Sequence, residues 1–319
     1  MKNLSKLIVL ALALILVFTL AACSGGSAKY TVGICQLTQH AALDEATQGF
    51  MDALENALPG QVDFDNQNAS GDLSLCSSIV TQFSAADVDL ILANATPALQ
   101  TAVSTTDTIP ILSTSVTEYS AALDLKDFDG IIGGNISGTS DLAPLADQAA
   151  MVKEWFPDKK NVALLYCSSE ANSQFQVDGM KAELEQLGYT CKYFSFTDSN
   201  DLFSVVSGAV NYADLIYVPT DNTIAANTSI VDNCCRDAKI PVIGGEKSLC
   251  SGCGVATLSV NYYDLGYTTG EMAAKILTGE ANISEMPIQY AEYSKLYNAE
   301  ICADLGLTPP NGYTAITAD

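Results

Sequence analysis

The sequence predicts an α/β protein of two lobes, each built on a doubly wound parallel sheet, joined by a hinge of several chain crossings. Apolar strand patterns alternate with helical patterns from Tyr30 onward, and such alternation forms parallel sheets covered on both faces. The alternation restarts at residues 161–167. The 297 residues that follow a leader of 22 exceed one ordinary core and suit two lobes.

Residues 1–22 have the pattern of a secretory signal peptide. Lys2 and Lys6 precede the apolar run LIVLALALILVFTL, and small residues follow it. The run is also long enough for a membrane helix, so an uncleaved anchor is the alternative. The LAAC segment ending at Cys23 resembles a bacterial lipobox, which implies that Cys23 carries a lipid. Residues 23–28 would then form a flexible tether, and we expect a soluble body anchored to the outer face of a membrane.

The composition excludes one class of partner. The chain has 14 basic against 37 acidic residues and a net charge of −23, which falls by two more when Lys2 and Lys6 leave with the signal peptide. Such a surface repels phosphate backbones, so we expect no nucleic-acid binding.

The cysteines do not suggest a disulfide framework. An odd, scattered set with several members inside apolar runs is typical of small buried residues, so we expect reduced thiols. Besides Cys23 they are Cys35, Cys76, Cys167, Cys191, Cys234, Cys235, Cys250, Cys253 and Cys302.

The first half of the chain contains five strand patterns. They are β-rich or apolar, and lie at residues 30–35, 62–68, 88–94, 109–114 and 130–137. Helical patterns separate them, at residues 42–58, 73–85, 97–106 and 141–156. Residues 42–58 carry apolar side chains at helical spacing, Pro97 suits a first helical position, and Pro157 ends the last helix.

The second half of the chain repeats this alternation, and the chain then returns to the first lobe. Its strand patterns lie at residues 161–167, 191–196, 213–219, 240–245 and 254–260, and its helical patterns at 172–187, 202–210 and 224–238. A further helix at 262–279 follows after the second lobe is complete, and residues 282–294 cross again. We therefore assign residues 29–137 and 260–286 to the first lobe, and 138–259 and 287–319 to the second.

Polar clusters follow five of these strands. In open parallel sheets ligands bind beyond the carboxyl ends of the strands, where helix N-termini offer unpaired N–H groups. Helix capping explains any single cluster, but five at corresponding positions favour a polar cleft between the lobes. The cluster residues include Thr38, His40, Asn94, Thr96, Ser115, Glu170, Asp221 and Asn222.

The charges of these clusters favour a zwitterionic ligand. Arg236, the one arginine, lies in a helix, so no guanidinium is placed to clamp a phosphate. Glu170 or Asp221 would meet an ammonium group, and the hydroxyls and amides of the first lobe would meet a carboxylate. An α-amino acid is the simplest fit, with apolar walls from Tyr119, Tyr166 and Phe175.

Several motifs together resemble those of the substrate-binding lipoproteins of ABC transporters that include receptors for tryptophan and other aromatic amino acids. They are VGICQLTQHAALDEATQGFMDAL, NATPAL, GGNISG, LLYCSSEANS, IYVPTDNTIA, GGE and YYDLGYTTGEMAAKIL, and the resemblance covers about residues 31–305. It implies a periplasmic-binding-protein-like fold of type I that closes over one small ligand, and permease and ATPase partners. The positions it implies for the cleft are Thr38, His40, Thr96, Ser115, Ser169, Glu170, Asn172, Asp221, Asn222 and Glu246. Two departures, Cys167 for an expected Asn and Glu118-Tyr119 for Asp-Pro, lie close to the expected pocket and leave room for a ligand other than that of the tryptophan receptors.

Other functions have weaker support. Catalysis would have to use His40, the only histidine, and no nucleophile elbow is present. The pair Cys250 and Cys253 would hold a metal or act as a local redox pair, but a single C-x-x-C in a loop is a weak signal. We expect no enzyme activity, no metal, no cofactor and a monomer. A signalling receptor or a nucleoside-binding protein of the same fold remains the alternative.

Overall fold

The computed structural model describes residues 29–317. The predicted signal peptide, the lipid-bearing Cys23 and the tether at 23–28 lie outside these residues. Within the described part of the chain, no helix is both long and apolar enough to cross a bilayer.

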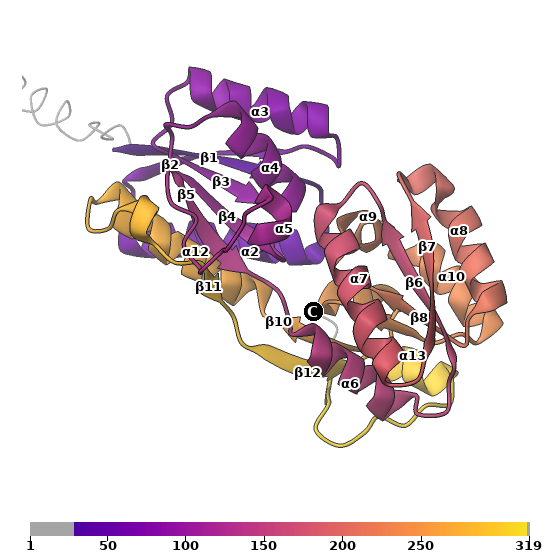
Figure 1. The fold of residues 1–319 in the computed structure, drawn as a ribbon. Coiled ribbons are helices and arrows are strands. Elements are labelled where there is room, and N and C mark those ends of the chain that lie inside the picture. Colours follow the sequence, from indigo (N-terminus) through magenta and orange to yellow (C-terminus); the bar gives the residue numbers. More distant parts are fainter. Residues whose placement is uncertain (1–28, 318–319) are drawn as a thin grey trace, which may run out of the picture.

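Six parallel strands form the sheet of the first lobe, in the spatial order β11-β5-β4-β3-β1-β2 (Figure 1). Successive side chains of β1 point to opposite faces, so Ile34 and Cys35 enter different cores. The strands are β1 (Tyr30–Gln36), β2 (Val62–Asn68), β3 (Leu90–Asn94), β4 (Ile111–Val116), β5 (Ile136–Ser140) and β11 (Gln289–Tyr290).

Seven strands form the sheet of the second lobe, in the order β13-β12-β10-β9-β8-β6-β7. All neighbours are parallel except β10 and β12, which run antiparallel. The strands are β6 (Asn161–Cys167), β7 (Thr190–Phe196), β8 (Leu215–Val218), β9 (Val242–Gly244), β10 (Ala256–Val260), β12 (Tyr293–Tyr297) and β13 (Thr314–Ala315).

Helices cover both faces of each sheet, which confirms the predicted doubly wound lobes (Figure 1). On the first sheet, α2 (Ala41–Ala57) and α12 (Tyr262–Leu277) share one apolar core, and α3 (Leu73–Ala85) and α4 (Thr96–Thr105) share the other. The remaining helices are α5 (Tyr119–Leu123) and η2 (Ile283–Glu285) in the first lobe, and α6 (Leu145–Trp155), α7 (Ala171–Gln186), α8 (Ser199–Tyr212), α9 (Asn222–Ala225), α10 (Thr228–Ala238), α11 (Lys247–Cys253) and α13 (Ala299–Asp304) in the second.

The chain crosses between the lobes three times. It passes from β5 to α6, from β10 to α12 and from β11 to β12. Asp141 lies on the first crossing, and its carboxylate accepts a hydrogen bond at 2.7 Å from the hydroxyl of Tyr262, on the second. Three crossings agree with the expected multi-strand hinge. The exact residues of the lobe boundaries stay a prediction.

Helix α12 is fixed to the first lobe by close backbone contact with α2. A Cβ atom placed on Gly266 would lie 1.9 Å from the carbonyl oxygen of Ala46, and one on Gly49 would lie 2.1 Å from that of Tyr263. Only glycine allows this approach. The second crossing therefore begins on an element held firmly by the first lobe.

Two elements differ from the sequence prediction. The helix expected at 224–238 is divided into α9 and α10, because Asn227 leaves helical geometry, with φ −136° and ψ 29°. The strand expected at 130–137 begins only at Ile136, because three glycines before it have positive φ values.

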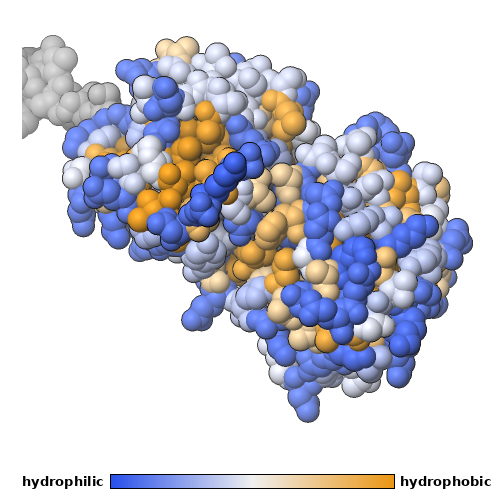
Figure 2. All heavy atoms as spheres, viewed as in Figure 1, coloured by the Kyte–Doolittle hydropathy of each residue, from blue (hydrophilic) through white to orange (hydrophobic). Residues whose placement is uncertain are grey.

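The surface differs between the lobes. Figure 2 shows mainly hydrophilic residues on this face of the second lobe, and an apolar area on the first lobe over the region labelled β5 in Figure 1. Tyr290 of β11 is 61% exposed and Ile131 is 44% exposed. Neither residue lines the cavities between the lobes.

Candidate functional site

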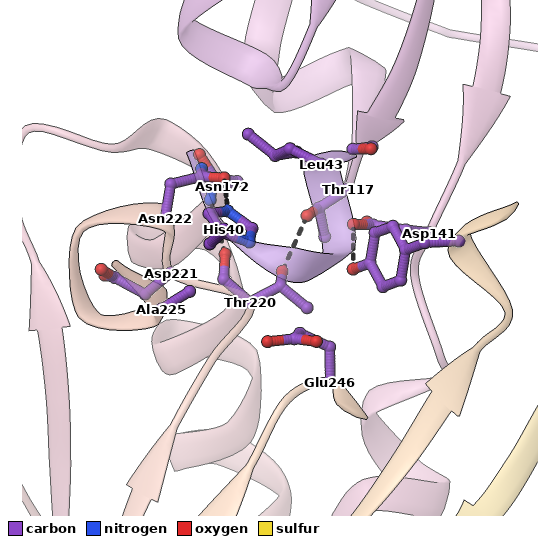
Figure 3. A pocket seen from close by; sticks show the side chains of 12 residues that line it. His40, Leu43, Thr117, Asp141, Asn172, Thr220, Asp221, Asn222, Ala225 and Glu246 are labelled. Atoms are coloured by element: carbon purple, nitrogen blue, oxygen red, sulfur yellow. Dashed lines mark hydrogen bonds between the residues drawn. The ribbon is translucent and has the colours of Figure 1, made fainter. Parts of the chain in front are cut away.

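A cavity lies between the lobes, at the carboxyl ends of their strands (Figure 3). Six of the eleven residues predicted to bind ligand line it, and both lobes contribute. The lining residues are His40, Leu43, Ser115, Thr117, Asp141, Asn172, Thr220, Asp221, Asn222, Ala225, Glu246 and Tyr262.

The lobes are closed around this cavity. The His40 Nε2 atom lies 3.2 Å from Asn222 Oδ1, across the cleft. The hydroxyls of Thr117 and Thr220 also meet across the cleft, at 3.0 Å (Figure 3). A ligand held here would contact both lobes at once. The closed cavity has a volume of only about 10 Å³, so an amino acid would have to widen it or extend into the adjoining cavity of about 720 Å³, which shares His40, Glu246 and Tyr262.

The other predicted residues lie beside or below the cavity. Thr38, Ser169 and Glu170 line a neighbouring cavity, which shares Asn222 with the first. Asn94 is fully buried, and its amide donates to Leu43 O and Thr47 Oγ1. Thr96 is buried at the start of α4 and lines neither cavity.

Both carboxylate oxygens of Glu170 accept hydrogen bonds from donors of its own lobe. Oε2 accepts hydrogen bonds from the backbone N (3.1 Å) and the side-chain amide (2.6 Å) of Asn222. Oε1 accepts from the backbone N (2.9 Å) and the hydroxyl (2.8 Å) of Thr223. This carboxylate fixes the loop after β8 to the loop after β6, and has little capacity left for a ligand ammonium.

Asp221 and Glu246 are similarly occupied. Asp221 accepts from the backbone N of Cys167 and Ile224 and from the hydroxyl of Ser173. Burial, followed by the neighbouring Glu170 charge, raises the pKa of Asp221. Glu246 caps α11 through Ser248 and Leu249.

The carboxylate with a free oxygen is that of Asp141, which the sequence analysis missed. Asp141 is 5% exposed. Its Oδ2 is bonded to Tyr262, and its Oδ1 is buried without a hydrogen-bond partner among the described residues. Burial raises the pKa of Asp141. The nearby hydroxyls of Tyr262 and Thr117 partly offset this increase, and the charge of Glu246 adds to it. A ligand cation at Oδ1 would offset the free-energy cost of burying the ionised carboxylate.

The first lobe presents strained backbone on its side of the cleft. Ser115 has a φ of +56°, where the pairing register of β4 with β5 shifts. Its hydroxyl is buried and has no partner within residues 29–317. Ala95, between β3 and α4, has a φ of +96°, a conformation that disfavours side chains. Strain of this kind collects at binding sites, where surrounding contacts enforce it.

The aromatic walls expected from the sequence lie elsewhere. Tyr119 is buried in the first core, where its hydroxyl meets Ser113 and Thr139. Tyr166 packs against Tyr193 within the second lobe. Neither of these residues nor Phe175 lines the cavity, whose aromatic lining comes from His40 and Tyr262.

The cavity lining is acidic. It holds Asp141, Asp221 and Glu246 and no lysine or arginine. Within residues 29–317 no cluster of His, Cys, Asp and Glu is arranged to hold a metal ion. Cys250 and Cys253, predicted in a loop, lie on helix α11 with both thiols buried. A ligand that suits this cavity would therefore supply a positive charge and hydrogen-bond donors.

Comparison with known proteins places the chain. The family model for ABC transporter substrate binding proteins matches residues 31–315. The chain belongs to this family. It is 35% identical over 262 residues to a tyrosine-binding protein of Clostridioides difficile strain R20291, covering 81% of this chain and 75% of that one.

Two solved structures resemble the chain closely. An ABC domain of Streptococcus pneumoniae in complex with L-Trp has a TM-score of 0.85 and 31% identity, covering 91% of this chain and 100% of that one. A substrate-binding protein of Clostridium difficile in its ligand-free, open form has a TM-score of 0.69 and 35% identity, with the same coverage. The lower score despite the higher identity agrees with the closed lobes described here.

Membership explains the architecture. ABC transporter substrate-binding proteins are extracytoplasmic binding proteins rather than enzymes. Solved structures with only 13–15% identity share the two-lobed periplasmic-binding-protein-like fold. The predicted family and fold are therefore confirmed. The lipid anchor stays a prediction, as do the roles of the individual residues.

Proposed function

We propose that this substrate-binding protein captures one amino acid, an aromatic one such as tyrosine or tryptophan, in the cavity between its lobes. The similar protein at 35% identity is a tyrosine-binding protein, and the similar structure at 31% identity is a complex with L-Trp. A lipid on Cys23 would hold the receptor at the outer face of the membrane, where it delivers the amino acid to permease and ATPase subunits.

The observation that carries the proposal is the free Oδ1 of Asp141, buried in an acidic cavity. A ligand ammonium would give this oxygen its missing donor and relieve the repulsion between Asp141 and Glu246. The Ser115 hydroxyl lies on the same side, since the Asp141 backbone N bonds to Val116 O at 3.3 Å. The Ser115 hydroxyl would donate a hydrogen bond to the ligand carboxylate.

The same geometry supports a closure mechanism. Asp141 and Tyr262 belong to two crossings of the hinge, whereas Asn172 and Asn222 belong to the second lobe. A ligand between them contacts every one of these groups only in the closed form. Binding therefore shifts the open and closed populations toward the closed form, which the transporter subunits would recognise.

Isothermal titration calorimetry tests the proposal. The mature protein should bind L-tyrosine or L-tryptophan, and should not bind 3-(4-hydroxyphenyl)propionate, which lacks the amine. Asp141→Asn removes the charge with little change in shape. It should weaken binding by about 30- to 100-fold, because a hydrogen bond to a charged group contributes about 2–3 kcal/mol.

The matched control is Asp237→Asn, on the exposed side of α10. It should retain the wild-type affinity. If no amino acid binds, the proposal fails. If Asp141→Asn binds as tightly as the wild type, the ammonium partner lies elsewhere.

A further inference from the structure

The tautomer of His40 follows from its neighbours. The Asn222 side-chain amide donates to Glu170 Oε2 at 2.6 Å, so its oxygen is the atom that faces His40 Nε2. The reverse orientation would set two acceptors against each other. Nε2 must therefore carry the hydrogen, and in a neutral ring Nδ1 is then an acceptor. Within residues 29–317, this buried Nδ1 has no hydrogen-bond partner.

Asn172 presents a second free acceptor. Its side-chain nitrogen donates to Thr220 O at 2.8 Å and to Glu170 Oε2 at 3.3 Å. Turning the amide over would place its oxygen against both of these acceptors, so the orientation is fixed. Oδ1 is buried, and no described residue bonds to it. Asn172 as a whole is 4% exposed.

These two acceptors lie at the opposite end of the cavity from Asp141. Figure 3 shows Asn172, Asn222 and His40 grouped on one side and Asp141 on the other, with the contact between Thr117 and Thr220 between them. The cavity thus has an acceptor at each end, and a ligand that reaches both ends must displace the hydrogen bond between Thr117 and Thr220. An α-ammonium group can satisfy only one end.

From this arrangement we infer that His40 Nδ1 and Asn172 Oδ1 form a side-chain subsite that selects ligands whose side chain ends in a hydrogen-bond donor. The inference rests on the proposed function, and it narrows the ligand class to amino acids with a phenol or indole side chain. Phenylalanine and aliphatic amino acids would bury both acceptors without a partner. Each unmet acceptor costs about 1–3 kcal/mol, and sites built for a donor reject analogues that lack it.

Two ligand pairs test the subsite on the unmodified protein. L-Tyrosine and L-phenylalanine differ by one hydroxyl, and L-tryptophan and 3-benzothienyl-L-alanine differ by replacement of the N–H with sulfur. Calorimetry first shows which of the two pairs binds more tightly. Within that pair, the amino acid with the O–H or N–H donor should bind at least about tenfold more tightly than its analogue, because one unmet acceptor costs about 1.4 kcal/mol or more.

Two substitutions of His40 assign the effect. His40→Gln keeps an N–H near the Nε2 position and removes the Nδ1 acceptor, so the L-tyrosine to L-phenylalanine affinity ratio should fall toward one. His40→Asn places an amide oxygen near the Nδ1 position and should keep more of the ratio. Asp237→Asn controls for general effects and should keep the wild-type ratio.

Each outcome bears on a different claim. Equal affinity for both members of both pairs overturns the subsite while the proposed function stands. An unchanged ratio in His40→Gln removes His40 from it. Absence of binding by every aromatic amino acid overturns the proposed function, and the subsite with it.

Discussion

The carboxylates of the second lobe and the carboxylate of the hinge contrast in what they bind. Glu170, Asp221 and Glu246 follow β6, β8 and β9, and donors of their own lobe occupy their oxygens. Asp141, on the first crossing, keeps one buried oxygen free of described partners. If Asp141 binds the ligand as proposed, burial alone does not distinguish it from the structural acids of this protein. The number of donors already in place does.

The two kinds of carboxylate also differ in their effect on the stability of the fold. A carboxylate that accepts several backbone hydrogen bonds stabilises the loops that carry those donors. A carboxylate that is buried with one donor opposes folding until a ligand supplies the second. The loops of the second lobe are thus stabilised without a ligand, whereas the unpaired carboxylate oxygen lies on a crossing between the lobes.

The largest expected effect comes from removing the most occupied carboxylate. Glu170→Ala leaves the backbone N–H groups of Asn222 and Thr223 without their acceptor. The free energy of unfolding should fall by about 3 kcal/mol, since each unmet donor costs about 1–3 kcal/mol. Urea unfolding measures this.

Two variants serve as controls for Glu170→Ala. Glu185→Ala, in the exposed pair with Lys181 on α7, should change stability by less than about 0.5 kcal/mol. Asp141→Asn removes an ionised group that opposes folding, and should leave stability equal or higher. A loss of stability in Asp141→Asn as large as that in Glu170→Ala would remove the contrast between the two regions.

The pH dependence of binding sharpens the contrast. The raised pKa of Asp141 means that the folded protein holds this proton more tightly than the unfolded chain does. The contribution of Asp141 to stability is therefore most favourable at low pH, and is lost as the pH rises through its folded-state pKa. A ligand ammonium needs the ionised form, so ligand affinity should fall as the pH is lowered through that pKa, by at most about tenfold per pH unit.

Calorimetry between about pH 5 and pH 8 checks this dependence. Asp141→Asn cannot ionise and should give a flatter profile at its lower affinity. A wild-type profile without slope, or an unchanged slope in Asp141→Asn, would show that another group controls the pH dependence.

Local patterns predicted most of the fold because each strand and helix carries its own apolar period. The restart at residues 161–167 and the return at 262–279 were visible in the same way. The short strands β11 and β13, of two residues each, have no period to detect. Their place depends on strand ends that meet only in the folded protein.

The site was less predictable, because hydrogen-bond occupancy depends on which loops become neighbours. Sequence position suggested Glu170 as a ligand partner, but the pairing of β6 with β8 brings Asn222 and Thr223 onto it. Asp141 was missed because it was assigned to a helix at 141–156. That helix begins only at Leu145, directly after Pro144, and this leaves Asp141 on the crossing.

The smallest expected effect concerns a carboxylate paired across the cleft. Glu45 of α2 lies 3.1 Å from Lys247 Nζ of α11, and both side chains are about one-third exposed. The pair exists only when the lobes close, so Glu45→Gln should weaken ligand binding through closure alone. The change should be less than about fivefold, because exposed pairs contribute about 0.2–1 kcal/mol. It should shrink as salt is added, since salt screens the wild-type pair. A larger, salt-independent loss would mean that Glu45 contacts the ligand, and the acidic binding surface would then extend from the hinge into the first lobe.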